Sequence, residues 1–239
     1  MQEETVVVLM STYNGERFLE KQLLSILQQQ SCNVQLVIRD DGSSDNTVSI
    51  IKHYATMYTN IHLIVGKNVG FKNSFNELIQ FASRCNSKYY AFVDQDDVWL
   101  KKKLQTAIDY LRKVDDNIPC AFSSNSKLID QYDNPIGIYI PFSLRLTKLT
   151  LLINGLFQGC SMVFNKKAVD IWRSPCYDST NKNAMTQSSK QGDPLREVPV
   201  GARHSAIKLP NWLYSGCVEL EVDADGSSRY SSRDMMVSR

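Results

Sequence analysis

Residues 89–99, Tyr-Tyr-Ala-Phe-Val-Asp-Gln-Asp-Asp-Val-Trp, are an apolar run that leads directly into three carboxylates within four positions. Carboxylates packed at the end of a buried strand repel one another and lose hydration, so such a cluster usually receives a compensating charge. Hard oxygen ligands favour Mg²⁺, Mn²⁺ or Ca²⁺, and Mg²⁺ in particular also binds phosphate oxygens of a substrate. The pattern predicts a cation held between protein and diphosphate. An acidic turn capping a helix that starts near Trp99 is the alternative.

An alternation of strands and helices surrounds this stretch. The strands are expected at residues 6–10, 34–38, 61–65 and 89–93. Helical periodicity of apolar residues follows each of them, at residues 16–29, 48–58, 71–82 and 100–111. Asn14 and Asp45 are suited to cap the first two helices. This order implies right-handed crossovers, and it predicts an α/β fold with a mainly parallel sheet and helices on both faces.

Polar clusters follow three of the expected strands, at residues 11–14, 40–41 and 94–97. Ligands of open α/β sheets bind outside the carboxyl ends of the strands. Each cluster alone has an explanation as a turn or a helix cap. Because all three would meet along one sheet edge, a ligand site is the better interpretation.

The pattern loosens after Lys113. Short strands are expected at residues 120–124, 126–129 and 161–164, with a turn at 131–135. From about residue 174 the composition shifts to Ser, Asn, Gln, Gly and charged residues, with one strand or hairpin within 212–222 and a flexible tail from 225. We therefore divide the chain into a domain over residues 1–172 and an atypical, truncated or disordered segment over residues 173–239.

Composition excludes several classes of protein. Lys and Arg total 27 against 25 Asp and Glu, so the net charge of +2 gives no reason to expect nucleic acid as a partner. The six scattered cysteines lack close pairs and indicate free thiols. We see no secretory signal and no run of about 18 apolar residues, so a cytoplasmic location is expected. The basic cluster at residues 101–103 is either a solvated face or a contact to anionic lipid at the inner face of the plasma membrane.

The usual phosphate-binding loops are missing from the sequence. No G-x-G-x-x-G follows the first strand and no G-x-x-x-x-G-K-[ST] occurs, which argues against an NAD dehydrogenase and a P-loop NTPase. A nucleotidyltransferase should carry a basic, Gly-rich loop after its first strand, and residues 11–17 do not provide one. The charge of a bound phosphate would have to be met by a metal instead.

Four segments together resemble consecutive motifs of family 2 glycosyltransferases with the GT-A fold. They are residues 8–15 (Val-Leu-Met-Ser-Thr-Tyr-Asn-Gly), 39–47 (Arg-Asp-Asp-Gly-Ser-Ser-Asp-Asn-Thr), 68–71 (Asn-Val-Gly-Phe) and 94–99 (Asp-Gln-Asp-Asp-Val-Trp). The resemblance covers about residues 5–170. The last segment is similar to that of enzymes that add rhamnose or related sugars to bacterial surface polysaccharides. The resemblance implies a nucleotide-sugar-binding GT-A domain.

The resemblance also implies roles for individual residues in binding the donor. Ser11, Thr12 and Tyr13 would line the base pocket, although Tyr13 could equally be a packing residue. Asp41 would accept the pyrimidine N3 hydrogen and Asp94 would contact the ribose or the diphosphate. The metal, Mn²⁺ or Mg²⁺, would bind Asp96, and Asp97 would assist or cap the next helix. Asn68 and Lys72 are further candidates for the phosphate side.

The implied reaction is a displacement with inversion at the anomeric carbon of a dTDP- or UDP-sugar, with a glycan or lipid-linked acceptor. A carboxylate must deprotonate the acceptor hydroxyl. Residues 159–165 resemble the acceptor-side Gly-Cys strand of the family, but the acidic motif expected further along is not recognisable. Asp193 is the candidate base and Asp178 a second, and either could simply be an acidic residue in a flexible segment. A nucleotide-sugar-binding remnant without this base is therefore the alternative function.

Overall fold

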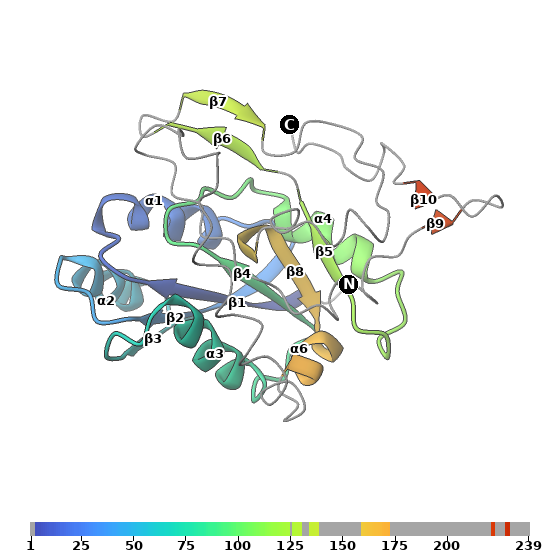
Figure 1. Cartoon of the computed structure of the whole chain (residues 1–239), viewed down its shortest axis with the longest axis horizontal. Helices are drawn as coiled ribbons and strands as arrows, with labels where there is room; N and C mark the ends of the chain where they lie inside the picture. Colours follow the sequence, from blue (N-terminus) through green and yellow to red (C-terminus); the bar gives the residue numbers. More distant parts are fainter. Residues whose placement is uncertain are drawn as a thin grey trace, which may run out of the picture.

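The computed structural model describes residues 3–124, 126–130, 134–138, 159–172, 221–222 and 228–229. Its centre is a six-stranded sheet in the order β3-β2-β1-β4-β8-β5 (Figure 1). The first four strands are parallel, and β8 runs antiparallel to both of its neighbours. The predicted α/β fold with a mainly parallel sheet is confirmed.

The elements of the sheet and its cover follow the predicted order. The strands are β1 (Glu4–Thr12), β2 (Cys32–Asp40), β3 (Ile61–Val65), β4 (Tyr89–Val93), β5 (Ala121–Ser123) and β8 (Met162–Asn165). The helices are α1 (Glu16–Leu27), α2 (Thr47–Met57), α3 (Phe71–Ala82), α4 (Lys103–Leu111) and α6 (Lys166–Trp172), and the 3-10 turn η1 (Gly159–Ser161) precedes β8. Strands β1 and β2 are each longer than predicted, so Ser11 and Arg39 belong to strands rather than turns.

Two apolar layers cover the two faces of the sheet, because successive side chains of a strand point to opposite sides. Val6, Val8 and Met10 pack with α1, α2 and α4. Val7 and Leu9 face the other way and pack with α3 and α6. All five of these β1 side chains are at most 3% exposed. Helices on both faces were predicted, and this arrangement explains why β1 reads as a continuous apolar run.

The first two helices begin side by side. Asp45 bonds the first residue of α2 as expected of a cap, although Asn46 occupies the N-cap position, whereas the predicted cap of α1 was wrong. Asn14 was expected to cap α1, but it has a φ of 47° and its Oδ1 accepts a hydrogen bond from Ser44 N instead. Gly15 occupies the N-cap position, without a side-chain cap. Asp45 accepts hydrogen bonds from Thr47 N in α2 and from Glu16 N in α1, while Glu16 accepts one from Asn46 N. These exchanged bonds tie the two loops at the carboxyl ends of β1 and β2 together.

Two predicted helix boundaries were wrong. Helix α4 begins at Lys103, not near Trp99, and Leu100 is 44% exposed. Its first turn is capped from the turn after α1, where Gln29 Oε1 accepts the hydrogen bond of Leu104 N. Tyr58, predicted to point inward from the second helix, lies just beyond α2 and is 36% exposed, although its ring stacks on Tyr54. A distant polar side chain set the start of α4, which local periodicity does not report.

Beyond α4 the structure describes shorter pieces. Strands β6 (Lys127–Ile129) and β7 (Pro135–Ile138) form a separate antiparallel pair, as do β9 (Glu221–Val222) and β10 (Ser228–Arg229). The expected strands at 120–124, 126–129 and 161–164 are found within one or two residues as β5, β6 and β8. Strand β10 falls where a tail was predicted. The predicted turn at 131–135 and the strand or hairpin at 212–222 lie largely outside the described residues.

Candidate functional site

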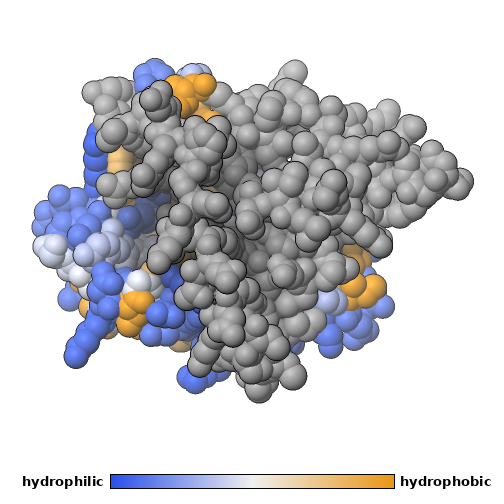
Figure 2. All heavy atoms as spheres, in the orientation of Figure 1, coloured by the Kyte–Doolittle hydropathy of each residue, from blue (hydrophilic) through white to orange (hydrophobic). Residues whose placement is uncertain are grey.

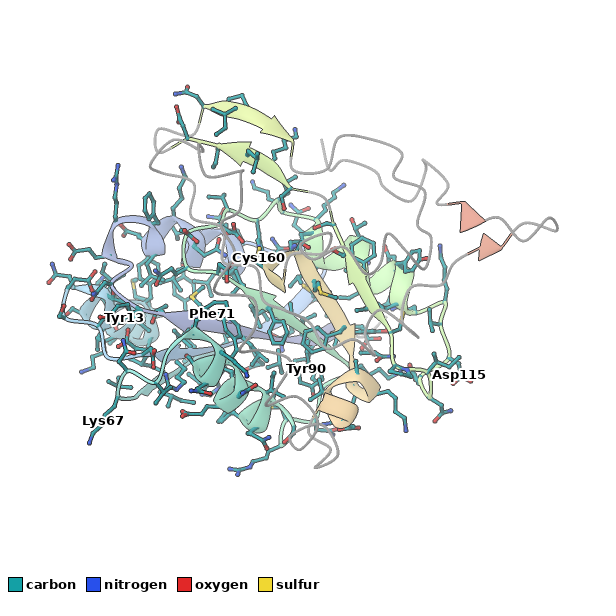
Figure 3. All side chains as sticks on the ribbon, in the orientation of Figure 1. Tyr13, Lys67, Phe71, Tyr90, Asp115 and Cys160 are labelled. Carbon is teal, nitrogen blue, oxygen red and sulfur yellow. The ribbon has the colours of Figure 1, made fainter. Side chains whose placement is uncertain are left out.

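The strand register brings the three polar clusters to one edge of the sheet. Met10 is aligned with both Ile38 and Val93, so the next residues along the three strands are Ser11, Arg39 and Asp94. Figure 3 shows Tyr13 and Lys67 at this end of the molecule, and Asp115 at the opposite end. The carboxyl edge of the sheet is the position at which α/β folds bind ligands.

The predicted base-pocket residues of β1 are placed in three different environments. Ser11 is half-buried and its hydroxyl pairs with Ser74 of α3. Thr12 is 1% exposed and donates a hydrogen bond to Asp40. Tyr13 is 48% exposed, so its ring is available to a ligand. The role of these residues in binding a nucleobase stays a prediction.

Asp41, directly after β2, is held by three residues on two segments, β2 and the loop after β3. Its Oδ1 accepts hydrogen bonds from Val69 N and Arg39 Nη1, and its Oδ2 accepts one from Gly70 N. Burial opposes the ionisation of Asp41, but the hydrogen bonds from Val69, Arg39 and Gly70 outweigh it, so the pKa of Asp41 is lowered. Asp41 is therefore an ionised acceptor, with one lone pair of Oδ2 left for a donor such as a pyrimidine N3 hydrogen.

Arg39 organises this corner and was not singled out from the sequence. Its guanidinium is 2% exposed and bonds Asp41, Ser74, Glu77 and the carbonyl of Lys67. It thereby connects β2, α3 and the segment after β3. A cation inside a predicted strand is the signal that could have identified it, because a buried Arg requires fixed acceptors.

The segment after β3 carries the predicted phosphate-side residues. Asn68 and Lys72 are both exposed, on the loop and the first turn of α3 respectively. Gly42 has a φ of +80°, and a Cβ there would lie 3.0 Å from Asn68 N. The loops after β2 and β3 consequently approach closely at Gly42, which places Asn68 beside the Asp41 corner.

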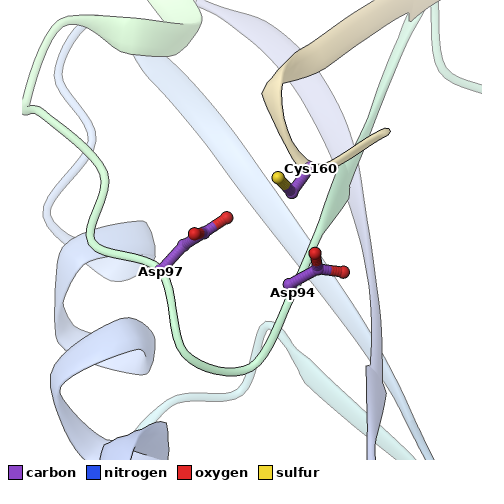
Figure 4. A group of neighbouring side chains, drawn as sticks. All are labelled: Asp94, Asp97 and Cys160. Carbon is purple, nitrogen blue, oxygen red and sulfur yellow. The ribbon is translucent and has the colours of Figure 1, made fainter. Parts of the chain in front are cut away.

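The acidic loop after β4 forms a compact cluster with a thiol. Ligand atoms of Asp94, Asp97 and Cys160 all lie within 4.8 Å of one another. Figure 4 shows Asp94 at the end of β4, Asp97 further along the loop, and Cys160 facing both from η1. Asp94 Oδ1 is buried and accepts no hydrogen bond. Burial, together with the charges of Asp97 and Asp96, raises the pKa of Asp94 well above its usual range.

This cluster fits a divalent cation. Asp94 and Asp97 supply the hard carboxylate oxygens that Mg²⁺ and Mn²⁺ prefer, and the orphaned Oδ1 lacks a counter-charge of its own. Among the described residues, the three whose ligand atoms lie within 4.8 Å of one another do not include Asp96. Asp96 is half-buried and acts on Asp94 through its charge. Its predicted role as metal ligand stays a prediction.

The interpretation of the acidic cluster as a helix cap is wrong. Helix α4 begins at Lys103, six residues after Asp97, and has Lys102 at its N-cap with no side-chain hydrogen bond. The side chain of Lys103 instead contacts the segments that adjoin the acidic cluster. Its Nζ donates hydrogen bonds to Ser124 Oγ and to the carbonyl of Ser161, and it lies 4.9 Å from the centre of the Trp99 ring. Burial lowers the pKa of Lys103, against the opposing charges of Cys160 and Asp97.

Polar residues of α1 and of the turn after it hold the acidic loop in place, and they were not singled out from the sequence. Gln22 donates to the carbonyl of Asp94, Ser25 Oγ accepts from Trp99 N, and Gln29 donates to the carbonyl of Leu100. Gln95 bonds both backbone groups of Tyr13. Polar residues on the inner face of an amphipathic helix are the signal that could have revealed this role. The backbone that carries the carboxylates is thereby fixed on both sides.

The predicted acceptor side is described only in part. The segment η1–β8 lies next to β4, so the Gly-Cys strand adjoins the acidic loop. The candidate bases Asp193 and Asp178 both lie outside the described residues. Cys32, Cys85 and Cys160 are free thiols, as predicted.

A mainly parallel sheet with polar loops and a buried carboxylate cluster at its carboxyl edge defines an α/β protein with a ligand site in the standard position. The chain belongs to glycosyl transferase family 2, whose model matches residues 7–172. The predicted family is confirmed.

Two bacterial proteins similar to this chain carry the names of glycosyl-transferring enzymes. The chain is 34% identical over 178 residues to the dTDP-rhamnosyl transferase RfbG of Shigella flexneri, covering 73% of this chain and 59% of that protein. It is 29% identical over 160 residues to TuaG of Bacillus subtilis (strain 168), a glycosyltransferase assigned to teichuronic acid biosynthesis, covering 66% of this chain and 60% of that protein. The chain thus spans about three fifths of the length of these relatives.

A solved structure has the same fold. The S. aureus protein TarS, residues 1–349 in complex with UDP, superposes with a TM-score of 0.53 at 19% identity, covering 68% of this chain and 47% of that chain. The predicted GT-A fold is confirmed by this likeness.

The described helices and surface were compared with what a membrane-spanning segment requires. None of the described helices combines the length and the apolar character needed to cross a membrane. On the face in Figure 2 the described surface is mainly hydrophilic, with small separate hydrophobic areas.

Proposed function

We propose that this chain is an inverting glycosyltransferase that transfers a sugar from a dTDP- or UDP-sugar to a glycan or lipid-linked acceptor in bacterial surface polysaccharide synthesis. The proposal rests on one observation above all. The buried side chain of Asp94, whose Oδ1 accepts no hydrogen bond in the described structure, lies at the same sheet edge as the β1 and β2 loops. The similarity to a dTDP-rhamnosyl transferase supports a deoxythymidine diphosphate donor.

The donor nucleotide is proposed to bind between the loops after β1 and β2. The exposed ring of Tyr13 offers a surface on which a base stacks, and Asp41 is fixed as an ionised acceptor. Ser11 and Thr12 shape the floor of the pocket, since their hydroxyls are committed to Ser74 and Asp40. Gln95 holds the backbone of Tyr13 and thereby sets the distance between base and diphosphate sites.

The diphosphate is proposed to lie over the acidic loop. Asp94 and Asp97, with Asp96 as the ligand that the family resemblance implies, would hold Mn²⁺ or Mg²⁺ there. When bound, this cation supplies Lewis-acid stabilisation of the charge that develops on the departing diphosphate. Asn68 and Lys72 are proposed to contact the phosphate oxygens from the β3–α3 side.

Transfer is proposed to be a single displacement. The acceptor hydroxyl oxygen forms a bond to the anomeric carbon as the bond to the diphosphate oxygen breaks, and the hydroxyl proton passes to a carboxylate base. Asp193 is our candidate for this base. We place the reaction in the cytoplasm, whose reducing conditions keep cysteine side chains as thiols.

A second function is favoured by a specific observation. The family's acidic acceptor-side motif is not recognisable in the sequence after residue 172. A nucleotide-sugar-binding remnant would keep the donor site and lack the base. It differs from the enzyme only in turnover.

Isothermal titration of the chain with UDP and with dTDP, each with and without Mn²⁺, tests donor binding. A donor-hydrolysis and sugar-transfer assay on the same preparation tests turnover. Mn²⁺-dependent binding together with turnover is the result we expect. Binding without turnover would select the remnant, and no binding of either nucleotide would contradict both functions.

Asp96→Ala tests the metal assignment made from the family resemblance. We expect it to abolish the Mn²⁺-dependent part of nucleotide affinity and leave the fold intact, because the side chain is not part of the core. Asp116→Ala is the matched control, since Asp116 is an exposed carboxylate whose salt bridge is to Lys88 on the surface. Nucleotide affinity that responds to Mn²⁺ equally in Asp96→Ala and wild type would contradict the assignment.

A further inference from the structure

We propose that Cys160 is a sulfur ligand of the cation at the acidic loop, so that the site binds Zn²⁺ and Cd²⁺ more tightly than Mg²⁺. This inference rests on the proposed function in one respect, because it concerns the same cation site. It adds a ligand from the η1–β8 segment to a site otherwise built from the loop after β4.

The separation of the three side chains suits a shared ion. Cys160 Sγ and the carboxylate oxygens of Asp94 and Asp97 lie within 4.8 Å of one another. Zinc binds sulfur at about 2.3 Å and carboxylate oxygen at about 2.0–2.2 Å, so an ion between them spans most of this separation. Small side-chain rotations would bring all three atoms into contact with it.

A second observation points to a ligand independently of the spacing. Asp94 is 9% exposed, and its Oδ1 is buried without a hydrogen-bond partner in the described structure. A buried carboxylate oxygen without a donor is costly unless a charge compensates it. Figure 4 shows Asp94 and Asp97 on the two limbs of the loop, with Cys160 above them on the neighbouring segment.

The surroundings of Cys160 distinguish it from the other described thiols that are free. Cys32 packs within the apolar layer of α1 and α2, and Cys85 Sγ contacts the carbonyl of Phe81. Cys160 is 5% exposed yet faces two carboxylates rather than apolar side chains. A small hydrophobic filler would face apolar side chains, whereas the sulfur of Cys160 adjoins carboxylate oxygens that a cation would bind.

The charges of the site balance when the sulfur binds as a thiolate. Asp94, Asp97 and the thiolate carry three negative charges. A divalent ion supplies two positive charges, and the side chain of Lys103, which donates a hydrogen bond to the carbonyl of Ser161 next to Cys160, lies beside the site as a further cationic group. Binding breaks the S–H bond and releases its proton to solvent as the sulfur–metal bond forms. Soft sulfur ligands select Zn²⁺ and Cd²⁺, while Mg²⁺ prefers oxygen alone.

Titration of the reduced full-length chain with Cd²⁺ alone tests the inference. The readout is the ultraviolet charge-transfer band of a cadmium–thiolate bond. We expect the band in the wild type, its loss in Cys160→Ser, and its retention in the control Cys85→Ser. Loss of even a supporting partner of a metal ligand costs about 10–100-fold in affinity, so Cd²⁺ and Zn²⁺ should bind Cys160→Ser at least about tenfold more weakly.

Asp94→Asn and Asp97→Asn retain the thiol. They provide a second test of the site if the cysteine variant does not fold. We expect either substitution to weaken the cadmium band, with circular dichroism unchanged. An equal band in wild type and Cys160→Ser would overturn the inference. If Cys160→Ser does not fold, a band unaffected by both carboxylate substitutions would overturn it as well.

Two measurements separate this inference from the proposed function. If UDP or dTDP binds with Mg²⁺ in wild type and Cys160→Ser alike and the cadmium bands are equal, the donor site stands and the sulfur ligand does not. If neither nucleotide binds but the band depends on Cys160, the sulfur ligand stands and the proposed function fails.

Discussion

The carboxyl ends of β2 and β4 carry similar acidic residues in opposite electrostatic environments. Asp40 accepts four hydrogen bonds, from Gly42 N, Ser43 N, Ser43 Oγ and Thr12 Oγ1. Asp41 is bonded by Arg39 and two backbone N–H groups, and its pKa is lowered. Asp94, two strand positions away in the sheet, has an oxygen without a donor, and its pKa is raised by burial first and by Asp97 and Asp96 second.

The two acidic loops therefore differ in how the negative charge of their carboxylates is compensated. The protein satisfies the β2 carboxylates from within, so they are fixed before any ligand arrives. It leaves the β4 cluster short of positive charge, so that cluster gains most from an added cation. Removal of a charged side chain should therefore lower the free energy of unfolding at the β2 corner and raise it at the β4 corner.

Arg39→Met should have the largest effect, at the β2 corner. Arg39 and Asp41 are 2% and 4% exposed in their ion pair, and loss of one partner leaves the other charge buried. We expect a loss of about 3–5 kcal/mol in the free energy of unfolding, measured by urea denaturation. Lys88→Met is the control, because its pair with Asp116 is 60% and 69% exposed and should be worth less than about 1 kcal/mol. Equal losses in both variants would contradict the buried-pair argument.

Asp94→Asn should act in the opposite direction at the β4 corner. Removal of an uncompensated buried charge should raise the free energy of unfolding in metal-free buffer by about 1–3 kcal/mol. The same variant should lose the stabilisation that added Mn²⁺ gives the wild type. Asp40→Asn is the matched control and should destabilise, since it removes an acceptor of several hydrogen bonds. Thermal melts with EDTA and with Mn²⁺ measure both, and the same sign in both variants would remove the contrast.

Gln95→Ala tests the bridge between the two corners. Its amide bonds Tyr13 N and Tyr13 O, so we expect a loss of about 0.5–1.5 kcal/mol in stability and weaker UDP binding. Gln80→Ala, an exposed glutamine on α3, should change neither quantity. Gly15→Ala should resemble Gln95→Ala, because its Cβ would lie 2.4 Å from Gln95 Oε1. Unaltered nucleotide affinity in both variants would exclude the bridge from donor binding.

The smallest expected effect is a pH dependence at Asp41. Its pKa is lower in the folded than in the unfolded chain, so between the two values the unfolded chain binds more protons. Its stabilisation is complete above the unfolded pKa and is lost as the pH falls through the folded pKa. The stability gap between wild type and Asp41→Asn should therefore narrow on acidification, as measured by urea denaturation at a series of pH values. A constant gap would show that Asp41 keeps the same pKa on unfolding.

The contrast also shows how far the sequence could be interpreted. The apolar runs and helical periodicity predicted the first four strands and their helices, because those patterns depend on local side-chain alternation. The start of α4 was not predictable in this way, since it depends on Gln29, which follows α1 and lies more than seventy residues earlier in the chain. The same holds for Arg39, whose acceptors come from β2, the β3–α3 loop and α3.

By itself the sequence determined the order of elements, the sheet edge at which polar residues gather, and the family. Only the tertiary structure decided which carboxylates are satisfied and which are not, and it brought Cys160 to the acidic loop. The physical reason is that burial and hydrogen-bond partners arise from segments distant in the chain. The order of Asp94, Asp96 and Asp97 in the sequence does not show which carboxylate oxygen will lack a hydrogen-bond donor in the folded chain.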